Sequence, residues 1–353
     1  MPKDSLPPLP LSGLFAVAKP SGPTSMAIIN DVKDLVNTSP LFVERGKLAA
    51  HKEGKNEKQK RRKWKSNKDM VKIGQGGTLD PLADGVLVVG IGRGTKKLSE
   101  FLDCVKEYKT TCLLGCETDS YDCQGAQVRV APWRHVTREM VENALPVFRG
   151  QIEQTPPIFS ALKMDGKPLY EYARSGTPLP RKIEKRPVTI HSLEIEEWLG
   201  SDHSFRYPEQ VLSEDQRQAL EKTLRSVQED ARVVDEPEEP VEDDRAPTAF
   251  VLRMKVSGGT YVRSIVHDLG HAVGSAAHVV TLTRSRQGRF TLEPTEGDMG
   301  CISWDVFKAA KEDAGPADEG GYTAWEREVL DKIETIDTSV TTASGAKRGQ
   351  SSS

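Results

Sequence analysis

The stretch at residues 71–97 constrains the fold more than any other part of the chain. Within it, the run GVLVVGI at residues 85–91 is short, apolar and bounded by glycines. Its length and β-branched content predict a strand that is buried on both faces. Such a strand needs apolar layers above and below it, and a chain of 353 residues, enough for one or two domains, can supply them.

A glycine-lined turn precedes this predicted strand and presents one carboxylate, Asp80. Gly74, Gly76 and Gly77 permit positive φ angles and leave room for a close approach. Pro81 fixes φ after the aspartate and biases Asp80 away from the helical region. Two interpretations remain open from these residues: Asp80 caps a turn, as Asx side chains often do, or it is a functional acid.

Helical and strand-like patterns continue on both sides of this stretch. Residues 13–20 are typical of a short strand, and Lys19 taken by itself is interpreted as its solvated end. Ser25 is predicted to cap a helix whose apolar face contains Ile28, Ile29, Val32, Leu35 and Val36. Strands are predicted at 108–115, 186–190 and 250–256, and helices at 98–102, 137–148 and 262–273, the last ended by Gly274.

The string GGTLDPLADGVL at residues 76–87 resembles the signature of the TruB-type tRNA pseudouridine-55 synthases. In that family the aspartate of this motif is the catalytic nucleophile, a role that the resemblance assigns to Asp80. It implies the pseudouridine-synthase fold, which is α+β with a mixed, largely antiparallel central sheet flanked by helices. The implied reaction converts the T-loop uridine of tRNA to pseudouridine by base flipping and without a cofactor.

Other segments resemble the same family and imply further site residues. GLFAVAKPSGPTS at 13–25 matches a motif whose Lys-Pro, here containing Lys19, packs beside the catalytic loop. GGTYVRSIVHDLG at 258–270 implies that Arg263 holds Asp80 as a bidentate fork. It also implies that Tyr261 lies against the uracil as a candidate for proton removal at C5. The matches around KEY at 106–108 and TLTRS at 281–285 imply that Tyr108 and Leu282 complete the apolar walls of the pocket.

The segment QTPPIFSALKMDGKPLYEYAR at 154–174 resembles an element that grips RNA in the same family. Lys163, Lys167 and Arg174 have the charge to contact phosphates, and Tyr170 and Tyr172 offer packing faces. For any one of these residues, a place on a surface helix is the open alternative.

The chain departs from the family pattern at Gln75, where the usual residue is a histidine that contacts RNA (G-H-x-G-x-L-D-P). Glutamine donates and accepts hydrogen bonds at similar reach, but it cannot become cationic. If the position needs only hydrogen bonds, the protein is active. If it needs a group that carries a proton, the protein is a slow enzyme or mainly a binder.

The net charge of −3 hides a strong asymmetry between two predicted insertions. Residues 44–72 contain 12 Lys or Arg against four Asp or Glu, which predicts a solvated, disordered insertion at 44–70 that binds RNA or directs nuclear import. Residues 200–247 are acidic and proline-dotted, which predicts a mobile insertion with one helix near 214–228. The predicted organisation is a disordered N-terminus at 1–12, a catalytic domain at 13–305 and a C-terminal tail at 306–353. Too few residues remain for the C-terminal RNA-binding domain of bacterial members.

No pattern in the chain predicts a metal or a cofactor. The spacing of the five cysteines fits no common zinc site, so we interpret them as reduced thiols of an intracellular protein, and the seven histidines form no ligand pair. The run GIGRGTK at 90–96 is neither G-x-G-x-x-G nor a P-loop. No apolar run approaches about 18 residues, so no membrane span is expected, and the proline-rich N-terminus is not a secretory signal.

The expected partner is tRNA through its T-stem-loop, with some mRNA, and the expected state is a monomer. We expect the nucleus, the mitochondrion or both as its location, with the cytoplasm as the alternative. The rival interpretation is a non-catalytic protein that binds or folds RNA and retains the synthase fold. Asp80, Tyr261 and Arg263 together favour the enzyme, because a pure binder has little need for all three.

Overall fold

The computed structural model describes residues 9–53, 71–175, 177–225, 235–236 and 245–336. None of the helices in these ranges is long and apolar enough to cross a membrane. The segment 54–70, most of the predicted basic insertion, lies outside the described residues, as do the predicted N-terminus at 1–8 and the chain beyond 336.

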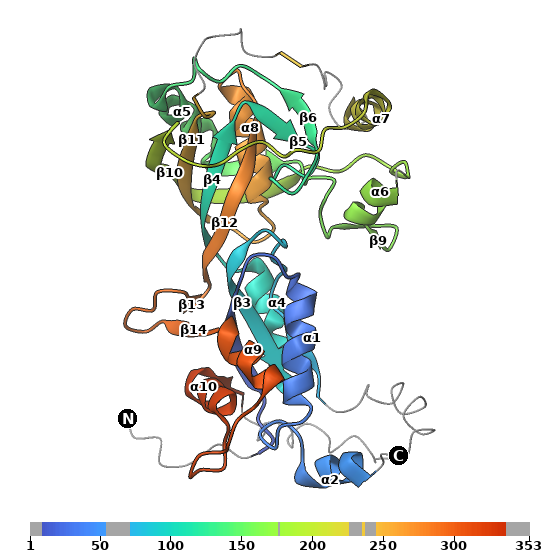
Figure 1. The fold of residues 1–353 in the computed structure, drawn as a ribbon, viewed down its shortest axis with the longest axis vertical. Coiled ribbons are helices and arrows are strands. Elements are labelled where there is room, and N and C mark those ends of the chain that lie inside the picture. The colour runs from blue at the N-terminus through green and yellow to red at the C-terminus, as the bar shows by residue number, and fades with distance from the viewer. Residues whose placement is uncertain (1–8, 54–70, 176, 226–234, 237–244, 337–353) are drawn as a thin grey trace, which may run out of the picture.

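The chain contains runs of consecutive strands with helices between them (Figure 1). The strands are β1 (Gly13–Lys19), β2 (Ile73–Gln75), β3 (Asp84–Ile91), β4 (Lys106–Leu114), β5 (Cys116–Thr118), β6 (Gln127–Val130), β7 (Gly150–Gln154), β8 (Lys163–Met164), β9 (Lys167–Pro168), β10 (Arg186–Gly200), β11 (Ala249–Val256), β12 (Ala277–Gln287), β13 (Phe290–Thr291), β14 (Met299–Ser303) and β15 (Glu334–Thr335). The helices are α1 (Ser25–Val36), α2 (Arg45–Glu53), α4 (Leu98–Asp103), α5 (Arg138–Ala144), α6 (Leu169–Ser175), α7 (Glu214–Arg225), α8 (Val262–Ala272), α9 (Trp304–Glu312) and α10 (Ala324–Lys332), with 3-10 turns η2 (Gly92–Lys97) and η3 (Leu145–Phe148).

An 11-stranded mixed sheet runs the length of the molecule in the order β2-β3-β1-β14-β13-β12-β4-β11-β10-β7, and β15 pairs with β1 beside this path. Most neighbours are antiparallel, while β1–β14, β13–β14 and β3–β12 are parallel. The small sheets β5–β6 and β8–β9 stand apart from it. The predicted class, α+β with a mixed, largely antiparallel sheet flanked by helices, is confirmed.

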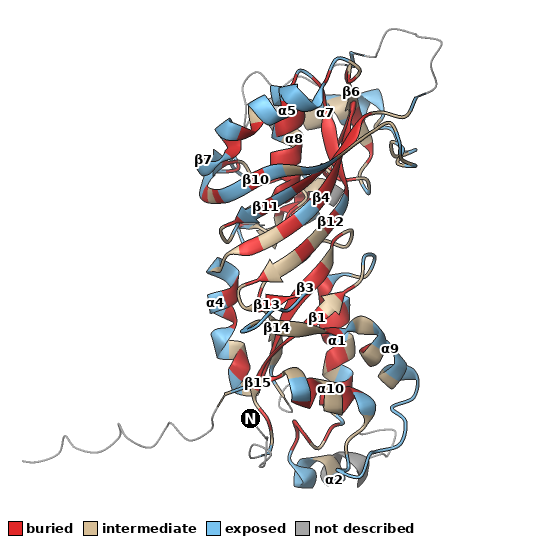
Figure 2. Ribbon diagram, turned by 90° about the vertical axis from the view of Figure 1, so that its left-hand side faces the viewer, coloured by how far each residue is buried: buried red, intermediate tan, exposed pale blue. Residues whose placement is uncertain are grey.

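The strand predicted from residues 85–91 is β3, and it is buried on both faces. Leu87 and Val89 belong to the core that includes α1 and α9, whereas Val86 and Val88 pack with Leu98 of α4 on the opposite face. Figure 2 shows these buried strands between α4 on one side and α1 and α9 on the other. Apolar side chains on both sides of a pleated strand explain why its sequence lacks alternation.

The predicted helix at 262–273 is α8, which packs with α5 on one face of the upper half of the sheet (Figure 1). Val262, Ile265 and Leu269 are buried at helical spacing, and Gly274 follows with a φ of 70°. The positive φ explains why glycine ends this helix. The elements predicted at 13–20, 98–102, 108–115, 186–190 and 250–256 also occur.

Strand β12 joins the upper and lower halves of the molecule. It pairs with β4 above and meets β3 below, where Arg284 lies opposite Gly85. Gly85 has a φ of 105°, and a Cβ there would lie 2.2 Å from the carbonyl oxygen of Arg284. This crossing admits only glycine, and it fixes the end of the Asp80 loop against β12.

Three local predictions in the first half of the chain are wrong in detail. Thr24, not Ser25, caps α1, because its hydroxyl accepts a hydrogen bond from the Ala27 amide at 3.1 Å. The predicted helix at 137–148 is α5 followed by η3, since Pro146 cannot continue an α-helix. The basic segment at 44–70 begins with an ordered helix, α2.

The acidic insertion at 200–247 is packed at its start, which its charge did not predict. Phe205 and Tyr207 pack against Leu113 and Val280, and the Tyr207 hydroxyl donates to the Leu114 carbonyl oxygen at 3.0 Å. The acidic residues are concentrated later in the insertion. Its first part contains aromatic side chains, which have apolar area to bury against the sheet. The predicted helix near 214–228 occurs as α7.

The sequence predicted only a tail beyond Trp304, but residues up to 336 form part of the fold. Phe307 of α9 is fully buried, and its ring lies 6.1 Å from Phe15 and 6.3 Å from Trp325 of α10. Three aromatic rings spread over β1, α9 and α10 bury enough area to hold this segment on the sheet. Glu326 completes a capping box with Thr323 at the start of α10.

Candidate active site

Arg263 lies in the first turn of α8 and holds Asp80 from the opposite side of the pocket. Its Nε donates to Asp80 Oδ2 at 2.8 Å, and the guanidinium side chain is 4% exposed while that of Asp80 is 35% exposed. Nη1 and Nη2 donate instead to the carbonyl oxygens of Ser120 at 2.6 Å and Phe159 at 2.9 Å. The expected bidentate hydrogen bond from Arg263 to Asp80 is therefore wrong in detail. Backbone carbonyl oxygens accept from Nη1 and Nη2, which leaves Nε for the carboxylate. These bonds fix the orientation of the guanidinium, which donates one hydrogen bond to the solvent-facing carboxylate of Asp80.

A second carboxylate, Asp122, lies behind Arg263 and was missed in the sequence. Its Oδ2 is 3.7 Å from Arg263 Nε, and its Oδ1 accepts from the Ser120 hydroxyl at 2.7 Å. Burial raises the pKa of Asp122, and the Arg263 charge opposes this rise. The only sequence signal was its place in the turn TDSYDCQG at 118–125. Arg263 is therefore close to two carboxylates, the buried Asp122 and the accessible Asp80.

One pocket brings together predicted residues from four separate segments of the chain. It is lined by Thr78, Leu79, Asp80, Tyr108, Thr260, Tyr261, Val262, Arg263 and Leu282. Tyr108 comes from β4, Leu282 from β12 and Tyr261 from the residue before α8. An accessible carboxylate with aromatic and aliphatic walls suits a flat, uncharged ring held beside a reactive oxygen.

Tyr261 is positioned by a buried amide that the sequence analysis did not single out. Gln154, at the end of β7, donates from Nε2 to the Tyr261 carbonyl oxygen at 3.0 Å and accepts from the Tyr261 amide at 2.8 Å. Burial raises the pKa of the Tyr261 phenol, and the negative charge of Asp80 adds to the rise. The side chain therefore carries a neutral hydroxyl at neutral pH.

Lys19 is buried and lies beside the catalytic loop, so the solvated strand end is wrong. Its Nζ donates to the carbonyl oxygens of Ala83 at 2.5 Å, Pro20 at 2.9 Å and Pro81 at 3.3 Å. Burial lowers the pKa of Lys19 to about 8, while the charges of Asp84 and Asp80 oppose the change. The ammonium therefore ties the loop to β1, the arrangement that the family resemblance implied.

Two polar side chains of β12 hold the loop and were not assigned a role from the sequence. Arg284, fully buried, donates from Nε to the Val86 carbonyl oxygen at 2.8 Å and from Nη2 to that of Gly77 at 3.0 Å. Gln287 Nε2 donates to the Gly76 carbonyl oxygen at 2.5 Å. Both side chains therefore fix the glycine-rich start of the loop against β12.

Ser25 holds the same loop from the side of α1. Its hydroxyl donates to the Leu79 carbonyl oxygen at 2.8 Å and accepts from the Leu79 amide at 2.9 Å. The residue expected to cap a helix instead holds the residue before Asp80. The Asp80 loop is thus fastened at both ends by side chains from distant elements.

Three predicted RNA-binding residues lie outside the lining of this pocket. Gln75, in β2, donates to the Thr78 hydroxyl at 3.1 Å, and its Oε1 is buried with no hydrogen-bond partner among the described residues. Lys163 is exposed in β8, and Arg174 lies in α6. Gln75 touches the pocket lining through Thr78.

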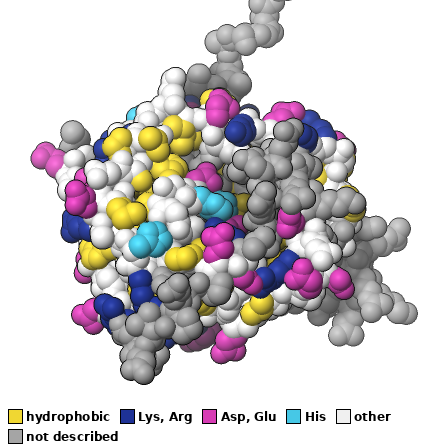
Figure 3. Space-filling model, turned by 90° about the horizontal axis from the view of Figure 1, so that it is seen from above, with side chains coloured by type: hydrophobic (Ala, Val, Ile, Leu, Met, Phe, Trp, Pro, Cys, Tyr) yellow, Lys and Arg dark blue, Asp and Glu magenta, His cyan; other side chains and the backbone are white. Residues whose placement is uncertain are grey.

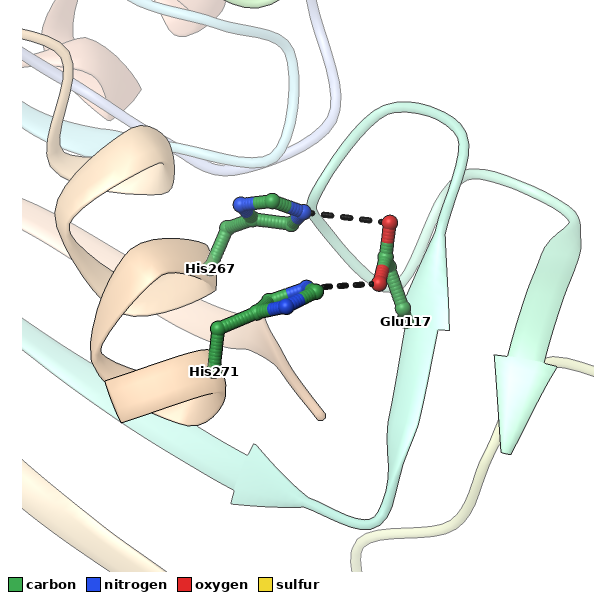
Figure 4. Close-up of side chains that lie close together, drawn as sticks. All are labelled: Glu117, His267 and His271. Carbon is green, nitrogen blue, oxygen red and sulfur yellow. Dashed lines mark hydrogen bonds and ion pairs between the residues drawn. The ribbon is translucent and has the colours of Figure 1, made fainter. Parts of the chain in front are cut away.

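Two histidines that were not paired in the sequence come together in the structure. His267 and His271 lie one turn apart on α8, and both face Glu117 of β5 (Figure 4). The signal in the sequence was their spacing of four residues, which places side chains on one face of a helix.

The chain is similar to known proteins over most of its length. Residues 61–210 match the model described as TruB family pseudouridylate synthase (N terminal domain). The chain is 37% identical over 347 residues to tRNA pseudouridine synthase 4 of Schizosaccharomyces pombe, covering 84% of this chain and 83% of the relative. It is 34% identical over 361 residues to tRNA pseudouridine synthase 4 of Saccharomyces cerevisiae, covering 93% and 87%. A solved structure titled "Crystal structure of the archaeal box H/ACA sRNP Nop10-Cbf5 complex" aligns with a TM-score of 0.48 at 19% identity, over 95% of this chain and 65% of that chain.

The family model and the two yeast relatives define the class: the protein is a pseudouridine synthase, an isomerase that acts on RNA. Within that class, the chain belongs to the TruB family.

Proposed function

We propose that this enzyme converts the T-loop uridine at position 55 of tRNA to pseudouridine, with Asp80 as the nucleophile. The names of the two yeast relatives support tRNA as the substrate class. The signature around Asp80 supports the T-loop position. The observation that carries the proposal is an accessible carboxylate, held by a buried guanidinium, in a pocket walled by Tyr108, Tyr261 and Leu282.

The reaction breaks the bond from ribose C1′ to N1 of uracil and forms a bond from C1′ to C5. The proton on C5 is lost and N1 takes one up, so no redox partner or leaving molecule is needed. A base inside a folded T-loop is out of reach, so the nucleotide must turn out of its stack into the pocket. Asp80 then acts as a covalent nucleophile. Attack at C1′ and attack at C6 are the two alternatives for this covalent step, and removal of a proton by Asp80 is the alternative to a covalent step.

Arg263 is proposed to orient Asp80 through the reaction. The guanidinium keeps its place because it also binds two backbone carbonyl oxygens, so the carboxylate gains a partner without losing access to the base. Charge-assisted hydrogen bonds of this kind are stronger than neutral ones and add geometric control.

Tyr261 is proposed to pack against the flipped uracil. Its raised pKa disfavours the phenolate, and a neutral phenol is a poor proton acceptor. Removal of the C5 proton is the role that the family resemblance suggested for Tyr261, and Asp80 or water admitted after the base has rotated is the alternative acceptor.

Release of tritium from C5-labelled uridine in a T-stem-loop RNA tests the proposal directly. We expect release from the wild type and none from Asp80→Ala, with Asp34→Asn, an exposed aspartate on α1, as the matched control. A second RNA labelled only at other uridines tests the position. Binding of the T-stem-loop by Asp80→Ala distinguishes loss of chemistry from loss of RNA. Release by Asp80→Ala at the wild-type rate would refute the nucleophile, and release from the second RNA alone would refute the position.

A further inference from the structure

A polar cluster lies further along α8 than Arg263, on the next two turns of the helix, and is not used by the proposed reaction. Glu117 is buried in β5, and its two carboxylate oxygens face the two histidines of α8. His267 Nε2 lies 3.0 Å from Oε1, and His271 Nε2 lies 3.0 Å from Oε2. One ligand atom from each of the three side chains lies within 4.8 Å of the other two.

The two nitrogen–oxygen separations are close to those between the ligands of one small cation. Zinc binds imidazole nitrogen and carboxylate oxygen at about 2.0–2.2 Å, so neighbouring ligand atoms in a tetrahedral site lie roughly 3.3 Å apart. The nitrogen–oxygen separations of 3.0 Å need only a small outward movement. Two histidines and one glutamate are also a ligand set that zinc takes in proteins.

The surroundings of His267 are those of a metal ligand. Its Nδ1 lies 2.9 Å from Asp268 Oδ1, so a carboxylate can hold the ring with Nε2 free to bind. The Tyr121 ring stacks on the imidazole at a centroid distance of 3.9 Å and limits its rotation. Arg129 donates to the same cluster, with Nε 3.4 Å from Glu117 Oε2 and Nη2 bound to the Ser275 carbonyl oxygen. It can keep this bond while the other lone pairs of Glu117 bind an ion.

The cluster is open to solvent on one side. The side chains of Glu117 and His267 are 7% and 13% exposed, but that of His271 is 45% exposed. Figure 3 shows histidine side chains at the surface of this end of the molecule, next to acidic ones. An ion can therefore enter from solvent and keep a water molecule as its fourth ligand.

We propose that Glu117, His267 and His271 form a binding site for a divalent transition-metal ion, with Zn²⁺ as the best fit. This departs from the prediction of no metal made from the sequence. Imidazole and carboxylate ligands with an open fourth position favour zinc over magnesium or calcium, which prefer more oxygen ligands.

Protons compete with the ion for this site. Burial opposes ionisation of Glu117, but His267 and His271 hold the pKa of its carboxyl well below the usual range. Burial also opposes the charge on His267, yet Glu117 and Asp268 raise its pKa to about 9. Because the ligand atoms must be deprotonated to bind an ion, binding should weaken as the pH falls. Arg129 adds a positive charge to the same side and lowers the affinity further.

The site joins two elements that also hold Arg263. His267 lies one turn after Arg263 on α8, and Glu117 leads into the turn whose Ser120 carbonyl oxygen accepts from Arg263. A bound ion would fasten this turn to α8. It should stabilise the folded protein by mass action, whatever its effect on the reaction.

Titration of the full-length, untagged protein with ZnCl₂ at pH 8, after treatment with EDTA, tests the site. We expect one ion per chain by calorimetry. His271→Ala should lower the affinity by more than about 100-fold and Asp268→Asn by about 10–100-fold. His191→Ala, which removes an exposed histidine of β10, should leave the affinity unchanged. Zinc should raise the melting temperature of the wild type and of His191→Ala, but not that of His271→Ala.

Three results would overturn the proposal. The first is the absence of stoichiometric binding at pH 8. The second is equal affinity in His271→Ala and the wild type, which would place the ion elsewhere, for example at a thiol. The third is a melting temperature of His271→Ala that falls by the same amount in EDTA as in zinc, which would make the cluster a hydrogen-bonded network only. Since His271 is half exposed, its truncation should leave the protein folded, and circular dichroism checks this.

Discussion

Two regions of the molecule differ in how far apart in the sequence their contacting residues lie. They are the Asp80 loop and the small lobe formed by β8, β9 and α6 (residues 163–175). The loop is fastened by side chains far away in the sequence. Lys19 reaches Ala83 over 64 positions, and Arg284 reaches Gly77 over 207. Each of these bonds ends on a backbone carbonyl oxygen, so together they determine the path of the chain around Asp80.

The lobe is held mainly by residues near one another in the sequence. Its core contains Met164, Leu169, Tyr172 and Ile183, and the Tyr172 hydroxyl donates to the Met164 carbonyl oxygen at 3.1 Å. In Figure 1, α6 and β9 stand beside the main body. Regions with few distant contacts open and move at lower free energy than a packed core.

This difference separates two tasks of the enzyme. Reacting groups must be held to within a fraction of an ångström, which long-range contacts to a rigid sheet provide. A surface that binds RNA gains from adapting to it, which a locally stabilised lobe allows. We therefore expect changes around the loop to reduce turnover and changes in the lobe to reduce RNA affinity.

The largest effect is expected from Asp80→Asn. Turnover should fall by at least about 10³-fold, because the amide cannot act as a nucleophile. Asp80 is partly exposed on a loop, so the melting temperature should change little. Tritium release measures the turnover, and retention of RNA binding by the variant separates chemistry from affinity. A fall in affinity as large as the fall in rate would break the division between loop and lobe.

Arg263→Lys should follow, with turnover reduced by about 100-fold, or roughly 2.7 kcal/mol. An ammonium cannot reach Asp80, Ser120 and Phe159 in the directions that the guanidinium does. Arg253→Lys on the exposed face of β11 is the matched control. Equal losses of turnover and RNA affinity would indicate that Arg263 serves only to bind phosphate.

Lys19→Met should reduce turnover by about tenfold, because the loop loses a donor to three carbonyl oxygens. Lys19→Met should also change how the free energy of unfolding depends on pH. Because burial lowers the pKa of Lys19 from 10.5 to about 8, the unfolded chain binds more protons than the folded one between these values. The wild-type free energy of unfolding therefore contains a contribution that rises with pH over this range, and Lys19→Met lacks it.

Denaturant titrations at pH 8 and pH 10 measure this contribution, with Lys72→Met, an exposed lysine, as the control. If the variant and the wild type change in stability by the same amount between the two pH values, Lys19 does not occupy its buried position beside the loop.

Lys163→Ala should weaken RNA binding a few-fold and leave the turnover of bound RNA unchanged. Each phosphate that the protein no longer neutralises reduces the slope of log affinity against log salt by roughly 0.7–0.9. Lys109→Ala, an exposed lysine of β4 that pairs with Glu196, is the control. A reduced turnover at saturating RNA would mean that the lobe helps to position the reacting base, so that loop and lobe would not have separate tasks.

The smallest effect is expected from Gln75→His. A histidine nitrogen can replace the Gln75 amide as a partner of the Thr78 hydroxyl, which belongs to the pocket lining. Turnover at pH 7.5 should change by less than about tenfold, or 1.4 kcal/mol. A gain of about a hundredfold would show that a group able to carry a proton is needed at this position.

The sequence by itself determined the parts of the molecule that depend on neighbouring residues. The apolar run of β3, the periodic face of α8 and the glycine that ends it follow from local pattern and burial. The family motifs added the set Asp80, Tyr261 and Arg263, because each motif is contiguous and keeps its reactive residue at a fixed place. The sequence did not predict that the segments at 201–212 and 304–336 pack onto the fold, since their buried aromatic residues are separated by polar and acidic stretches.

The family motif placed Lys19 beside the catalytic loop, but only the tertiary structure decided which atoms hold that loop and what gathers around α8. Lys19, Ser25 and Arg284 bind backbone carbonyl oxygens, and every residue has a carbonyl, so no pattern in the sequence marks the acceptors. Glu117 and His267 are 150 positions apart and meet because β5 leaves the sheet beside α8. Contacts of this kind depend on the relative placement of whole elements, which is determined when the sheet and its helices pack together.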